Sequence, residues 1–63
     1  MKFKEGDRIK VKFNVTVDGG IYADKAGIIT RVIRETSYPY KVKFDNEQLP
    51  RMDFSGNELE KEE

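Results

Sequence analysis

The side chains that could carry chemistry in this sequence are hydroxyls and carboxylates, because the chain has no cysteine and no histidine. A catalytic nucleophile needs a base beside it, whereas Ser37 and Ser55 both lie in stretches typical of turns, where hydroxyls bond the local backbone. Asp45 and Glu47 flank a predicted hairpin tip, and exposed carboxylates lack the burial that tunes groups for acid–base catalysis. We therefore expect a protein that is not an enzyme.

The same residue types predict no metal site and no cofactor. Thiolate and imidazole, the usual zinc ligands, are absent. The acidic stretch 45–47 is too short for a calcium loop, which needs about twelve residues. Gly19 and Gly20 lead into a strand pattern rather than a helix, so they do not form a phosphate-binding loop.

Three basic residues form one candidate binding surface. Lys41 and Lys43 alternate along a predicted strand and so share its outer face, and Arg31 on the preceding strand could lie near them. Small barrels use such faces to bind RNA or single strands. The twelve basic and twelve acidic side chains cancel, however, and a duplex-DNA binder usually carries a basic excess. A nucleic-acid surface is therefore the alternative hypothesis, and an ordinary solvated strand is the simpler one.

Two tyrosines and a proline form the other candidate. In a small barrel the first long loop, which contains Tyr22, and the start of the third strand, which contains Tyr38, border one groove. Tyrosine combines apolar area with a polar tip and suits protein interfaces. Pro39 restricts Tyr38 to extended conformations. We predict a protein-binding site at Tyr22, Tyr38 and Pro39, with rings that merely cover the barrel ends as the other interpretation.

The elements that position these residues are short strands separated by turn formers. Residues 8–17 alternate strictly between apolar and polar, which predicts a half-buried strand. In a second strand, at 27–34, Ile29 and Val32 can both point inward only across a bulge. Residues 40–44 alternate again. A short return strand at 48–52, one 3-10 turn at 53–56 and a last strand at 57–60 complete the series, and no segment has a helical period. The predicted core includes Val11, Phe13, Ile29, Val42 and Phe44.

Three stretches resemble known small barrels. Residues 6–11, GDRIKV, are similar to the opening of many SH3-like barrels, and residues 26–32, AGIITRV, resemble the Gly-x-Ile-x-x-Val core of KOW-type modules. Residues 38–45, followed by 57–60, are similar to electron-transport accessory barrels such as the small accessory barrel protein of photosystem I. The resemblance covers nearly the whole chain. It implies an all-β, five-stranded SH3-like barrel over residues 1–60, with one 3-10 turn before the last strand. The charged terminal residues 61–63 are expected to form a frayed acidic tail.

The motifs of this resemblance concern the fold and assign no catalytic role. Together with the residues above, they predict a small binding or adaptor module that docks on a protein partner. The alternatives are a KOW-like nucleic-acid-binding module and a structural accessory component of a larger complex. No apolar run approaches the ~18 residues of a membrane span, and no apolar stretch follows the charged start. We therefore expect a cytoplasmic protein, monomeric or weakly oligomeric, without membrane contact.

Overall fold

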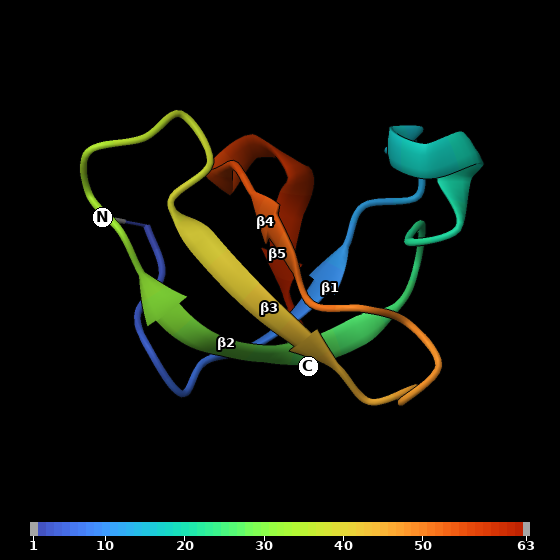
Figure 1. Ribbon diagram of the computed structural model, residues 1–63, viewed down its shortest axis with the longest axis horizontal. Helices are drawn as coiled ribbons and strands as arrows, with labels where there is room; N and C mark the ends of the chain where they lie inside the picture. Colours follow the sequence, from blue (N-terminus) through green and yellow to red (C-terminus); the bar gives the residue numbers. More distant parts are fainter. Residues whose placement is uncertain (1, 63) are drawn as a thin grey trace.

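Five antiparallel strands form one curled sheet, a half-barrel, in a computed structural model that describes residues 2–62 (Figure 1). The sheet order is β4-β3-β2-β1-β5. Two 3-10 turns, η1 and η2, lie in the first long loop and directly before β5. The expected all-β fold, with five strands and a 3-10 turn before the last, is confirmed. The elements are β1 (Arg8–Val11), η1 (Val17–Gly20), β2 (Ala26–Val32), β3 (Tyr40–Phe44), β4 (Met52–Phe54), η2 (Gly56–Glu58) and β5 (Leu59–Lys61).

Strand β2 bends so that it serves both halves of the sheet. Its register against β3 shifts between Ile29, opposite Val42, and Arg31, opposite Lys41. This bulge turns Ile29 into the core and lets Val32 pack against it as well. The bulge predicted from the spacing of these two apolar residues is therefore confirmed.

The core fills the concave side of the sheet. At its centre, Tyr22 stacks on Phe44 with ring centroids 5.1 Å apart, and Phe54 meets both rings edge-on at 5.6 and 5.9 Å. Residues from every strand, from the N-terminal segment and from the first long loop contribute. The buried apolar residues are Phe3, Ile9, Val11, Val15, Tyr22, Ile29, Tyr40, Val42, Phe44, Phe54 and Leu59.

The first strand is shorter than its alternating sequence predicts. β1 ends at Val11, and the N–H of Val15 donates to the carbonyl of Lys12 at 3.2 Å, which closes a turn. This turn leaves Phe13 77% exposed, so its predicted place in the core is wrong. β1 ends here because its antiparallel partner strands extend no further: β2 begins opposite Lys10, and β5 begins opposite Val11.

The C-terminal elements lie further along the chain than predicted. A turn in which the N–H of Leu49 donates to Asn46 O at 3.0 Å, followed by Pro50, delays the return strand until Met52. The 3-10 turn therefore occupies Gly56–Glu58 rather than 53–56, and β5 occupies Leu59–Lys61 rather than 57–60.

Lys61 and Glu62 do not form a frayed tail. Lys61 belongs to β5 and lies opposite Ile9, and the N–H of Glu62 donates to the carbonyl of Arg8 at 3.2 Å. For these two residues the predicted tail is wrong, because pairing with β1 continues through them; Glu63 lies outside the described residues. No helix within residues 2–62 has the length and apolar character to cross a bilayer.

A buried hydroxyl fixes the N-terminal segment, which gives a first testable prediction. Tyr40 Oη accepts the backbone N–H groups of Lys2 and Phe3 at 2.9 and 3.2 Å, and the Phe3 ring packs edge-on against Tyr40. Tyr40→Phe keeps the ring but removes this acceptor. We expect it to lower the free energy of unfolding by about 1–3 kcal/mol and to speed amide exchange at Phe3. Unchanged urea unfolding together with unchanged Phe3 exchange would contradict this assignment.

Candidate functional site

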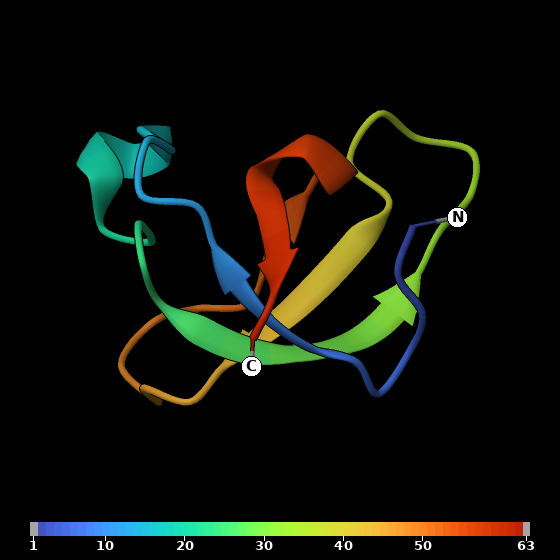
Figure 2. The ribbon, with the colours of Figure 1, turned by 180° about the vertical axis from the view of Figure 1, so that it is seen from behind.

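A groove of about 360 Å³ opens between two loops at one side of the curled sheet. The first loop, residues 12–25, contributes one wall, and the β2–β3 loop, residues 33–39, contributes the other. Both loops rise from the same side of the sheet, with β4 and η2 between them (Figures 1 and 2). The lining is largely apolar with two carboxylates, and its residues are Val17, Thr36, Tyr38, Met52, Asp53 and Glu58.

Local hydrogen bonds hold the polar parts of this groove. Glu58 closes a capping box with Ser55, because its Oε1 accepts the Ser55 backbone N–H at 2.9 Å and the Ser55 hydroxyl at 3.2 Å. In the second loop, the Tyr38 N–H donates to Thr36 Oγ1 at 3.3 Å. These bonds position side chains from η2 and from the β2–β3 loop before any ligand arrives.

The structure separates the two tyrosines of the predicted binding site. Tyr38 is 55% exposed and lines the groove, and half-buried Pro39 follows it directly before β3. Tyr22 is 1% exposed, so its predicted role in partner binding is wrong. The first loop turns back at this point, with the N–H of Lys25 donating to Tyr22 O, and the ring fills the open side of the half-barrel.

Five of the six groove residues were not identified from the sequence, Thr36 among them. Val17 and Met52 resemble ordinary strand residues, because both belong to apolar–polar alternations. Nothing in the sequence around Asp53 indicated a binding role. Glu58 did carry a signal, since the pattern Ser55-x-x-Glu58 is a capping box and places a carboxylate at the start of a helical turn.

The exposed large hydrophobic residues lie on the two loops that contribute to this groove. Within residues 2–62 they lie only in the first loop and in the loop that follows β2. Apolar patches rimmed by polar residues mark interaction surfaces more often than scattered single residues do. These exposed side chains are Phe13, Ile21, Ile33 and Tyr38.

The basic residues of the nucleic-acid hypothesis are only partly brought together. Arg31 and Lys41 face each other across β2 and β3, whereas Lys43 lies opposite Ile28. Lys41 is also opposite Asp53 on β4. A carboxylate thus borders the closest pair of cations, which reduces the positive potential of this face.

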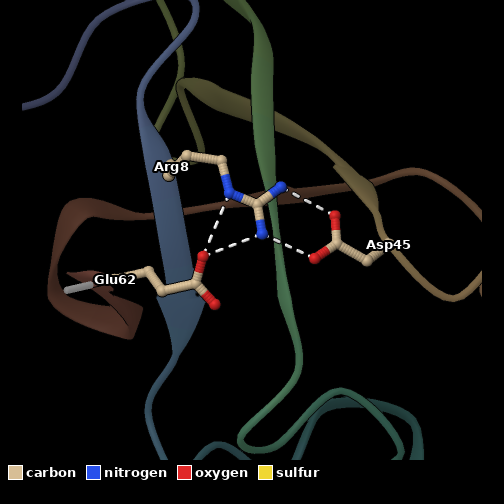
Figure 3. A network of polar contacts seen from close by, with 3 residues as sticks. All are labelled: Arg8, Asp45 and Glu62. Carbon is tan, nitrogen blue, oxygen red and sulfur yellow. Dashed lines mark hydrogen bonds and ion pairs between the residues drawn. The ribbon is translucent and has the colours of Figure 1, made fainter.

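An ion-pair network connects β1 to the residues that directly follow β3 and β5 (Figure 3). Arg8 Nη1 donates to Asp45 Oδ1 at 2.7 Å, and Nη2 donates to the second oxygen. Arg8 Nε also donates to Glu62 Oε1 at 3.0 Å. The hydrogen bonds from Arg8 hold the pKa of Asp45 below its ordinary value. Asp45 thus has a structural role, because it connects the β3–β4 turn to β1 and the C-terminal segment.

The lowered pKa of Asp45 predicts a pH dependence of stability. A carboxyl with a lower pKa in the folded state contributes stability above its unfolded pKa, about 4, and loses it as the pH falls through the folded value. The contribution is modest because the groups are exposed. We expect Arg8→Gln to flatten the decline in stability below about pH 4, as measured by urea unfolding across pH. Parallel curves for the parent and the variant would contradict this role.

The fold is shared with a solved protein. The NMR structure of Bacillus subtilis protein YorP matches the whole chain with a TM-score of 0.82 and 16% sequence identity, and the match covers 73% of that chain. No protein-family model matches the sequence, and no curated protein matches it. At this identity the likeness concerns the fold alone, so the function has to be argued from the groove.

Proposed function

We propose that this protein is a non-catalytic binding module of the SH3-like type that docks on a partner protein through the groove between its two loops. The observation that carries the proposal is the concentration of exposed Phe13, Ile21, Ile33 and Tyr38 on the loops that flank the groove. Aromatic residues beside a partly buried pocket supply much of the energy of protein interfaces. The sequence resemblance to SH3-like barrels agrees with a binding role.

The charges of the groove indicate what kind of segment it accepts. Asp53 and Glu58 are the acidic residues of the groove, and among residues 2–62 no basic residue lines it. Val17, Tyr38 and Met52 supply apolar surface beside them. Complementarity therefore favours a segment that combines an apolar side chain with lysine or arginine.

The nucleic-acid alternative rests on the cross-strand neighbours Arg31 and Lys41. If these side chains bound phosphates, the affinity for single-stranded RNA would fall steeply as salt rises. Because Asp53 lies opposite Lys41, we expect no such salt-dependent binding.

Tyr38→Ala tests the proposal with Arg31→Ala as its matched control. A random peptide library displayed on phage is selected against the immobilised protein, and a synthetic copy of the selected peptide is titrated into each variant. Both side chains are exposed, so we expect both variants to melt like the parent. Loss of Tyr38 should weaken binding at least about tenfold, the effect of an interface hot spot, and Arg31→Ala should leave it unchanged. If the two substitutions changed the peptide affinity equally, or if no peptide could be selected, the proposed function would be contradicted.

A further inference from the structure

One of the two free edges of the sheet runs along the groove. β4 is the terminal strand at one end of the order β4-β3-β2-β1-β5, opposite β5, and pairs with β3. Two of its three residues, Met52 and Asp53, line the groove. The backbone of an edge strand can pair with a further strand, so the groove offers main-chain groups in addition to side chains.

The alternation of hydrogen bonds shows which backbone groups face outward. Lys41 O accepts from Thr30 Oγ1 of β2 at 3.3 Å, and Asp45 N donates to Ala26 O of β2 at 3.0 Å. In an antiparallel sheet the N–H and C=O of one residue point to the same side, and successive residues alternate. Lys41 therefore turns its backbone toward β2 and shares no bonds with Asp53, its neighbour on β4. The N–H and C=O of Asp53 point away from β3, toward the free edge.

The free edge is short and has a defined end. At Ser55 the backbone N–H already donates to Glu58 Oε1 at 2.9 Å, and the carbonyl accepts the Glu58 N–H at 3.1 Å. On the other side, β4 begins at Met52, and both Met52 and Phe54 turn their backbones toward β3. The main-chain groups available for pairing are therefore centred on Asp53.

We infer that the partner binds as an extended segment that adds a sixth strand beside β4, with its backbone paired to Asp53. This inference rests on the proposed function and specifies the binding mode. Main-chain bonds supply affinity in strand addition, and side chains in adjoining pockets supply specificity. The carboxylates of Asp53 and Glu58 favour a lysine or arginine on the added strand.

A second copy of this chain fits the edge less well than a basic segment does. Two β4 strands paired antiparallel about Asp53 would place the two Asp53 carboxylates directly opposite each other. Like charges in that position destabilise a sheet. This repulsion between the two Asp53 carboxylates disfavours self-pairing and favours a foreign, cationic strand.

Amide hydrogen exchange on the unmodified chain tests this binding mode, with the synthetic library-selected peptide as the probe. At saturation we expect exchange at the Asp53 amide to slow at least about tenfold, because a free N–H becomes hydrogen-bonded. The Lys41 amide already faces β2 and should change little. Exchange at Asp53 that stays at the free rate in the saturated complex would overturn the inference. Protection of Asp53 without peptide, rising with protein concentration, would overturn it in favour of self-pairing.

Two substitutions distinguish the contribution of the Asp53 backbone hydrogen bond to peptide binding from that of the Asp53 carboxylate. Asp53→Ala and Asp53→Pro both lack the carboxylate, but only the proline variant also lacks the N–H. Proline is tolerated on an edge strand where the N–H faces outward, so both variants should fold. We expect Asp53→Pro to bind the peptide about tenfold more weakly than Asp53→Ala. Equal peptide affinities of the two variants would contradict strand addition but not groove binding. Failure to select a peptide would contradict the proposed function itself.

Discussion

Tyr22→Ala is expected to lower the free energy of unfolding by about 3–5 kcal/mol, the cost of deleting a buried aromatic ring. The ring is 1% exposed and contacts Phe44 at 5.1 Å and Phe54 at 5.6 Å between centroids. Its loss would leave a cavity between two other aromatic residues on the open side of the half-barrel. A domain of fewer than about 70 residues rarely draws more than about 3–5 kcal/mol from its single core, so the variant should be largely or partly unfolded at room temperature.

Tyr22→Phe is the matched control. No buried side-chain nitrogen or oxygen within residues 2–62 lacks a hydrogen-bond partner. Among the same residues, the Tyr22 hydroxyl forms no hydrogen bond that its replacement by Phe would remove. We therefore expect the phenylalanine variant to unfold within about 1 kcal/mol of the parent. If Tyr22→Ala instead melted like the parent and lost peptide binding, Tyr22 would belong to the binding site and the core would be misassigned.

Gly27→Ala is the second substitution with a large expected effect. A methyl group at Gly27 would lie 2.5 Å from Lys43 O and 3.0 Å from the Cα of Phe44. Both are backbone atoms of β3, so a side-chain rotation cannot relieve the clash. Since β2 is held between β1 and β3 at this point, we expect a loss of at least about 1–3 kcal/mol.

Gly56→Ala is its matched control, measured by the same urea unfolding. A methyl group there would meet Tyr40 Cε2 at 3.5 Å, an ordinary van der Waals contact. We expect little change in the free energy of unfolding. Similar losses for both variants would show that the close approach of β2 and β3 is not what requires glycine at position 27.

The strand faces were predictable from the sequence because they follow from local alternation. Tyr40, Val42 and Phe44 point inward as their spacing indicates, and the pair Ile29 and Val32 revealed the bulge in β2. Alternation fixes which side chains share a face, and a bulge is the simplest way for two residues three positions apart to share one.

The ends of strands were not predictable in the same way. The alternation of residues 8–17 continues past Val11, but pairing stops there because β5 begins at Leu59, far away in the sequence. Phe13 is exposed for that reason. The same non-local pairing holds Lys61 and Glu62, whose charged side chains gave no sign of a strand.

The groove was predictable in part. The expectation that the first loop and the start of β3 border one groove agrees with the positions of Val17 and Tyr38. Local sequence could not tell which residue of that loop faces the groove and which fills the core. Tyr22 is buried because Phe44 and Phe54, from two other strands, form a site for its ring.

The central claim, that a partner segment docks in the groove, is tested most directly by mapping amide chemical shifts while the selected peptide is titrated into the unmodified protein. We expect the largest shifts at the groove residues Val17, Thr36, Tyr38, Met52, Asp53 and Glu58. The outer strand face, with Ile28, Arg31 and Lys43, should remain nearly unchanged. Shifts concentrated on that outer face, with the groove unaffected, would contradict the account.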